Sequence, residues 1–184
     1  VRMIFLGNLI VSKGILTLIS ALRLLLDAGV AVECEVIGGF RDDEGERLVS
    51  EAIEKNKVGD HLRLLGPKYG ADKYQALYQA DVFVFPTQYP KEAFPLVNLE
   101  AMACGLPVVS SRLGGIVDMI DEGETGCLVA PGDERALANA LRPLLEDRAL
   151  RTRMGAKARR SYHTQFSYRV YQQNLAQILS ATSF

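Results

Sequence analysis

The run Val82-Phe83-Val84-Phe85 decides how this chain folds. It consists of four consecutive apolar residues that are β-branched or aromatic, with Asp81 before it and Pro86 after it. Such a run favours a strand that is covered on both faces. Strands of this kind belong to parallel sheets, whose crossover connections place helices on both sides. The run therefore predicts a central strand in an α/β protein.

Short β-rich runs alternate with longer helical patterns on both sides of this strand, as expected for a parallel sheet with crossover helices. Further strands are predicted at residues 3–6, 32–37, 62–65, 107–110 and 126–129. Helices are predicted at residues 13–28, 42–56, 72–80, 95–104 and 116–121, and throughout the chain after residue 129. We expect Ser12 to cap the first of these helices and Pro95 to occupy the first position of the fourth.

Length and composition place the chain among ordinary globular domains. Its 184 residues suit one domain, and 48% hydrophobic and 23% charged residues with a net charge of −1 exclude a disordered chain. The same charge balance argues against nucleic-acid binding by charge alone. Three cysteines without C-x-x-C spacing suggest neither a disulfide framework nor a zinc site.

Cellular location is inferred from what the sequence lacks. The longest mainly apolar stretch, residues 14–32, is interrupted by polar and charged residues and falls short of a membrane span. The chain opens on a strand-like run, without the basic region and cleavage site of a signal peptide. We therefore expect a cytoplasmic protein. An excess of basic residues between Arg142 and Arg169 is typical of a solvated helical face, and the alternative is peripheral contact with an anionic membrane.

Two carboxylates follow the central strand within the stretch Glu92-Ala93-Phe94-Pro95-Leu96-Val97-Asn98-Leu99-Glu100. Glu92 falls in a loop and Glu100 in the second turn of a helix, so both could face the crevice where open α/β sheets bind ligands. Unpaired N–H groups at Leu96 and Val97 would favour a phosphate, and the carboxylates would accept hydrogen bonds from hydroxyls. A phosphorylated sugar meets both preferences. The alternative is a solvated Glu92 and a surface Glu100.

A second stretch, Gly7-Asn8-Leu9-Ile10-Val11-Ser12-Lys13-Gly14, joins the first strand to the first helix. It matches neither the dinucleotide fingerprint G-x-G-x-x-G nor the phosphate loop G-x-x-x-x-G-K-[ST]. Lys13 could reach a diphosphate as a point charge, or it could simply be solvated.

Together these stretches resemble the C-terminal, nucleotide-sugar-binding domain of the retaining GT-B glycosyltransferases of family four. The resemblance continues through Glu100-Ala101-Met102-Ala103-Cys104-Gly105, Gly114-Gly115 and Gly123-Glu124-Thr125-Gly126, in order along nearly the whole chain. It implies a Rossmann-like, doubly wound parallel sheet that forms one half of a GT-B fold. It also implies that residues 1–184 are the donor-binding domain of an enzyme whose N-terminal acceptor domain is absent.

The resemblance also implies roles for individual residues. Glu92 and the backbone of Ala93, Phe94 and Pro95 would hold the donor sugar, and Lys13 would neutralise the leaving diphosphate. Leu96 and Val97 would lie at the diphosphate, Glu100 would bind the ribose hydroxyls, and Leu65 would lie near the base. Gly7 would be a further donor-binding residue. Asn8 stands where the family commonly has Arg. The asparagine side chain keeps a neutral hydrogen-bond donor at this position but lacks the bidentate positive charge of arginine.

The implied activity is transfer of a glycosyl group from a UDP-, GDP- or ADP-linked sugar to an acceptor hydroxyl, with retention of configuration. Neither a cofactor nor a metal is expected, because no acidic pair has D-x-D spacing. The C-terminal helix, residues 168–179, would cross back to the N-terminal domain. Two alternatives remain: a related GT-B sugar-nucleotide epimerase, and a non-catalytic nucleotide-binding or interaction module.

Overall fold

The sheet is parallel, as predicted, and its strands follow the order β3-β2-β1-β4-β5-β6. The structure is a computed structural model and describes residues 1–181. Its strands are β1 (Arg2–Leu6), β2 (Glu33–Ile37), β3 (Leu62–Leu64), β4 (Val82–Phe85), β5 (Val108–Ser111) and β6 (Gly126–Val129). The chain moves outward from β1 to β3 and then returns to pair β4 with β1, so the winding reverses between these two strands.

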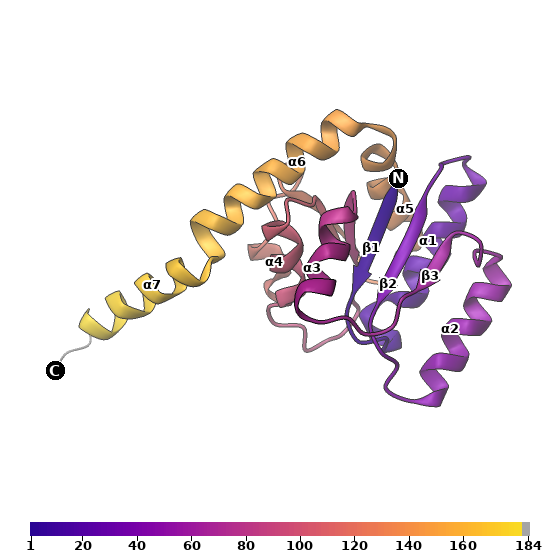
Figure 1. The fold of residues 1–184 in the computed structure, drawn as a ribbon, viewed down its shortest axis with the longest axis horizontal. Helices are drawn as coiled ribbons and strands as arrows, with labels where there is room; N and C mark the ends of the chain where they lie inside the picture. The colour runs from indigo at the N-terminus through magenta and orange to yellow at the C-terminus, as the bar shows by residue number, and fades with distance from the viewer. Residues whose placement is uncertain (182–184) are drawn as a thin grey trace.

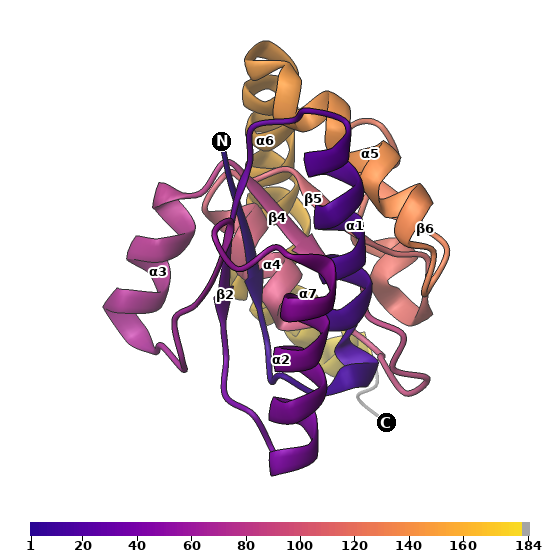
Figure 2. The same cartoon turned by 90° about the vertical axis from the view of Figure 1, so that its right-hand side faces the viewer.

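Helices cover both faces of the sheet (Figures 1 and 2). They are α1 (Ile15–Asp27), α2 (Asp43–Asn56), α3 (Gly70–Gln79), α4 (Leu96–Ala103), α5 (Glu134–Glu146), α6 (Arg148–Ser161) and α7 (Tyr168–Ala181). α1 packs between α2 and α5 on one face, and α3 and α4 lie on the other. α7 extends away from the body of the domain (Figure 1).

The central strand is buried along its whole length, as its sequence predicts. Every residue of β4 is at most 2% exposed, and the same holds for the core positions Ile15, Leu18 and Leu22 of α1. Burial also raises the pKa of the Cys34 thiol to about 12. That thiol therefore packs as a small hydrophobe.

Several predicted helix ends are wrong by a few residues. Val11–Lys13 forms a 3₁₀ turn (η1), and Gly14, with φ of 87°, is the N-cap of α1, so Ser12 is not the cap. Glycine is required there because a Cβ would lie 1.9 Å from the carbonyl oxygen of Pro86. Pro95 is the N-cap of α4 instead of its first residue. The predicted helix at 116–121 is a 3₁₀ turn, η2 (Gly114–Asp118).

The C-terminal part of the chain is helical but not continuous. The side chain of Asp147 accepts hydrogen bonds from the N–H groups of Ala149 and Leu150, and thereby starts α6 directly after α5. A π-helical turn, η3 (Tyr162–Phe166), separates α6 from α7. Among residues 1–181, no helix combines the length and apolarity needed to cross a bilayer.

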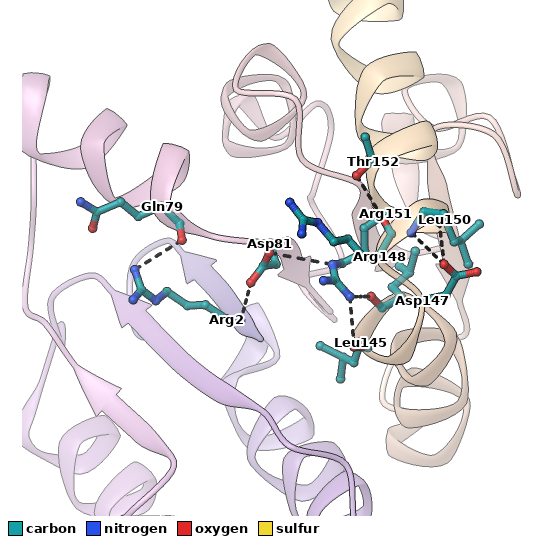
Figure 3. A network of polar contacts seen from close by, with 11 residues as sticks. Arg2, Gln79, Asp81, Leu145, Asp147, Arg148, Leu150, Arg151 and Thr152 are labelled. Carbon is teal, nitrogen blue, oxygen red and sulfur yellow. Dashed lines mark hydrogen bonds and ion pairs between the residues drawn. The ribbon is translucent and has the colours of Figure 1, made fainter.

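Arg151 ties this C-terminal part to the sheet (Figure 3). Its guanidinium donates to the carbonyl oxygens of Leu144 and Leu145 at 2.8 and 3.0 Å and lies 3.8 Å from the carboxylate of Asp81. Asp81 also accepts a hydrogen bond from the backbone N–H of Arg2. Part of the basic excess seen in the sequence therefore points inward.

We predict that Arg151→Ala lowers the free energy of unfolding by about 2–3 kcal/mol, because it leaves the last carbonyl groups of α5 without their charged donor. Urea denaturation of the chain measures this loss. Arg153→Ala is the control, since Arg153 is exposed on the same helix and should change stability by less than about 0.5 kcal/mol. Equal effects of the two substitutions would contradict the anchoring role.

Candidate functional site

The loops after β1 and β4 meet at the point where the winding of the sheet reverses. Ser12 accepts a hydrogen bond from the N–H of Gln88 at 2.7 Å, and Gly14 packs on the carbonyl of Pro86. In addition, the side-chain amide of Gln88 donates to the hydroxyl of Thr17 at 2.8 Å. Open α/β sheets bind ligands at this position.

Lys13 and Glu92 form an ion pair where these loops meet. The Lys13 Nζ lies 2.6 Å from the Glu92 Oε2, and the two side chains are 19% and 10% exposed. The Thr87 hydroxyl donates to the same oxygen at 3.1 Å, and the Tyr89 ring packs against the ammonium with its centroid 4.5 Å away. The pair is thus held from two sides by residues that the sequence analysis did not identify.

Glu100 forms a second ion pair, with Lys73 from α3. The Lys73 Nζ lies 2.7 Å from the Glu100 Oε1. Burial by itself would lower the pKa of Lys73, but the hydrogen bond and charge of Glu100 outweigh it and raise that pKa above its ordinary value. Lys73 therefore carries its charge at neutral pH.

Glu100 and Lys73 line a cavity of about 230 Å³ at the carboxyl ends of β1 and β2. Its wall comes from four segments that are distant in the sequence: the loop after β1, the loop after β2, the segment before α3, and α4. The lining residues are Leu6, Gly7, Asn8, Ile37, Gly38, Gly39, Pro67, Lys68, Tyr69, Lys73, Val97 and Glu100. The cavity therefore combines glycine-rich backbone with two lysines and one carboxylate.

In the sequence, the N-terminus of α4 lies between Glu92 and Glu100, the carboxylates of the two ion pairs. Its N-cap is Pro95, which provides no side-chain hydrogen bond to the first turn. A helix start of this kind leaves backbone N–H groups available and attracts anions through the helix dipole. The arrangement suits a ligand that has hydroxyls at both ends and negative charge in the middle.

Glycines 114 and 115 support the loop that carries Glu92. The N–H of Gly115 donates to the carbonyl oxygen of Ala93 at 2.8 Å. A Cβ at Gly115 would lie 2.3 Å from this oxygen, and one at Gly114 would lie 1.9 Å from the carbonyl oxygen of Glu92. Only residues without a side chain allow the two loops to approach so closely.

Comparison with known proteins identifies the family. The model of the family "Glycosyl transferases group 1" matches residues 2–161. The chain belongs to this family. It is 29% identical over 171 residues to the capsular polysaccharide biosynthesis glycosyltransferase CapM of Staphylococcus aureus, an alignment that covers 93% of this chain but only 43% of CapM. The chain thus spans less than half the length of this relative.

Solved structures confirm the GT-B relationship of the fold. The structure of Anabaena HepE in complex with UDP and glucose superposes with a TM-score of 0.88 at 25% identity, covering 97% of this chain and 48% of HepE. The C-terminal domain of a Francisella tularensis group 1 glycosyl transferase, LpcC, has the same fold, with a TM-score of 0.80 and 23% identity. That superposition covers 91% of this chain and 86% of the LpcC domain.

In this group 1 glycosyl transferase chain, the structure brings most of the predicted site residues together. Gly7, Asn8, Val97 and Glu100 line one cavity, and the Lys13–Glu92 pair lies in the adjoining loops. Leu65 does not line this cavity but a neighbouring polar one with Glu35 and Lys68, and Lys68 lines both, so the role of Leu65 near a base stays a prediction.

The side chains of Phe94 and Leu96 line a second, larger hollow, which adjoins the first at Glu100 because Glu100 lines both. Together with Tyr168 and Tyr171 of α7 they line an apolar groove of about 640 Å³, and the Phe94 ring lies 5.9 Å from that of Phe166. No cluster of His, Cys, Asp and Glu suited to a metal occurs within residues 1–181.

We predict that Gly115→Ala displaces the loop of Glu92, because the new methyl group would overlap the carbonyl of Ala93. Overlap with backbone costs about 1–3 kcal/mol when the surroundings cannot yield. Chemical denaturation should show this loss, and amide exchange should increase at Glu92 and Ala93. Gly59→Ala is the control, since its Cβ would meet only the side chain of Ile53 at 3.8 Å. A fully stable Gly115→Ala with unchanged exchange would contradict the steric argument.

Proposed function

We propose that this chain binds a nucleotide diphosphate sugar and is the donor-binding half of a retaining glycosyltransferase. The observation that carries the proposal is the pair of lysine-held carboxylates, Glu92 and Glu100, on either side of the α4 N-terminus. Carboxylates accept hydrogen bonds from sugar hydroxyls, and a helix N-terminus favours phosphate. The UDP and glucose present in the related HepE structure support this assignment.

Each part of the donor has a place in the proposed complex. Glu100 accepts hydrogen bonds from the ribose hydroxyls, the first turn of α4 binds the diphosphate, and Glu92 accepts from the donor sugar. Lys13 lies beside Glu92 and stabilises the charge that develops on the leaving diphosphate. Asn8, which is exposed on the cavity wall, contributes a neutral donor there.

Catalysis in this proposal consists of positioning and charge stabilisation. The acceptor hydroxyl attacks the anomeric carbon on the face that the diphosphate leaves, a phosphate oxygen takes its proton, and no protein nucleophile is involved. The acceptor must be held close to the anomeric carbon with water excluded. We assign that task to an N-terminal domain, since the chain spans only 43% of its relative CapM. The exposed apolar side chains of α7, including Tyr171 and Leu175, suit contact with such a domain.

We propose that the complete enzyme works in the cytoplasm. Exposed basic residues of α6, among them Arg148, Arg153 and Arg160, would allow it to touch an anionic membrane surface.

Binding of the donor tests the proposed function. One of UDP-, GDP- or ADP-glucose should raise the melting temperature of the chain, because a ligand that binds only the folded state stabilises it by mass action. Glu92→Ala should weaken binding of that sugar nucleotide by about 1–3 kcal/mol and leave binding of the bare nucleoside diphosphate nearly unchanged. Isothermal titration calorimetry measures both affinities.

Glu124→Ala is the matched control for this experiment. Glu124 also pairs with a lysine, Lys157, but is exposed and lies outside the cavity. It should alter neither affinity. Equal losses of sugar nucleotide and bare diphosphate on Glu92→Ala would contradict the contact with the sugar, and a chain that binds no nucleotide would refute the proposal as a whole.

We further propose that donor binding needs no metal ion, because Lys13 and the α4 N-terminus supply the positive charge. Addition of EDTA should therefore leave the affinity for the sugar nucleotide within about twofold, a difference of less than about 0.5 kcal/mol. Calorimetry with and without magnesium checks this. A tenfold loss on chelation, restored by magnesium, would show that a cation takes part.

A further inference from the structure

Lys73 is the residue in the cavity whose role the proposed function leaves open. It lies on α3, outside the two stretches that suggested the site, and reaches Glu100 on the neighbouring helix α4. Its side chain is 19% exposed and that of Glu100 is 23% exposed, so the pair is largely enclosed. The Nζ also lies 5.0 Å from the centroid of the Tyr74 ring. These contacts hold the ammonium in one place.

The ion pair uses one oxygen of the Glu100 carboxylate. Lys73 donates to Oε1 at 2.7 Å, and within residues 1–181 no hydrogen bond to Oε2 is found. Oε2 therefore remains available as an acceptor, and Glu100 lines both the cavity that contains Gly7 and Val97 and the larger groove that adjoins it. A carboxylate fixed at one oxygen has little freedom to turn, so a ligand hydroxyl meets an acceptor that is already oriented.

Lys73 also makes this carboxylate compatible with an anionic ligand. A lone Glu100 would repel a diphosphate in the same crevice, whereas the pair carries no net charge. Asn8 lines the same cavity, and this strengthens the argument, because no arginine stands at that position to balance the carboxylate.

We propose that Lys73 is a positioning residue that fixes Glu100 for ribose recognition and makes the site selective for ribonucleotides over 2′-deoxyribonucleotides. This inference rests on the proposed function. A fixed and largely enclosed acceptor loses its partner when a hydroxyl is missing, and sites of that kind reject the deficient ligand strongly. A carboxylate that is free to turn can pair with the remaining hydroxyl or with water, so it discriminates less.

A purely structural role for the pair makes a different prediction. If Lys73 only joined α3 to α4, its removal would lower the stability of the fold. It would also lower the affinities for ribonucleotide and deoxynucleotide by the same factor. The ratio of the two affinities therefore separates the two roles.

The experiment compares UDP, GDP and ADP with their 2′-deoxy counterparts by calorimetry, using the base that the wild-type chain binds best. Wild type should bind the ribonucleotide at least about tenfold tighter than the deoxynucleotide, as expected for the loss of one charge-assisted hydrogen bond. Lys73→Met keeps the length of the side chain but removes its charge. It should lower the affinity for the ribonucleotide by about tenfold and the affinity for the deoxynucleotide by less than about threefold. The ratio of the two affinities should therefore fall severalfold.

Three further single variants and one double variant complete the design. Lys73→Arg retains a cationic donor and should keep most of the selectivity. Lys157→Met removes a lysine from the Glu124 ion pair outside the cavity and should leave both affinities unchanged. Glu100→Gln should lower the selectivity for the ribonucleotide as Lys73→Met does. The double variant should show little further loss, because the effects of substituting two residues that act through one another are not additive.

The outcomes are distinct. A wild-type chain that binds none of the ribonucleotides refutes the proposed function and this inference with it. In a second outcome, the wild-type chain binds the ribonucleotide more tightly than the deoxynucleotide while Lys73→Met leaves the ratio of the two affinities unchanged. That result overturns only the role of Lys73. Should Lys73→Met fail to fold by circular dichroism, Lys73→Gln replaces it, with the same loss of selectivity expected and an unchanged ratio again decisive against the role.

Discussion

The parallel pairing of β1 with β4 is the constraint on which the rest of the structure depends. Met3 pairs with Val82 and Ile4 with Phe83, although β2, β3 and three helices lie between them in the sequence. Because the strands are parallel, their carboxyl ends point the same way, and the loops that follow them emerge side by side. The contact between Gly14 and Pro86 fixes how closely these loops pack. The contacts of the candidate site depend on this packing of the loops that follow β1 and β4.

Charge is distributed over the site as two neutral pairs instead of a basic patch. Lys13 pairs with Glu92 and Lys73 with Glu100, and each pair is mostly shielded from water. The carboxylates are thereby oriented without exposing a net negative charge to an incoming phosphate. The remaining attraction for an anion comes from the α4 N-terminus and from Lys68 on the cavity wall. In the proposed function, this arrangement would allow a chain with a net charge of −1 to bind a diphosphate.

The C-terminal helices contribute in two separate ways. α6 is anchored to the body of the domain through Arg151, whose contacts join the end of α5 to Asp81 beside the start of β1. α7 presents Tyr168, Tyr171 and Leu175 beside an apolar groove. The fold therefore separates a structural helix from one that is suited to contact another domain.

The fold class, the strands and the elements that carry the site could all be predicted from the amino-acid sequence. The apolar run of β4 and the 3.6-residue spacing of α1 are local patterns, so neither needs knowledge of the rest of the chain. The exact start of α1 could not be predicted in this way, because Gly14 is selected by its approach to Pro86, a residue far away in the sequence. Only the tertiary structure decided which lysine holds which carboxylate and that Thr87, Tyr89 and Lys73 take part. The reason is physical: these contacts join residues that become neighbours only when parallel strands bring their carboxyl ends to one edge of the sheet.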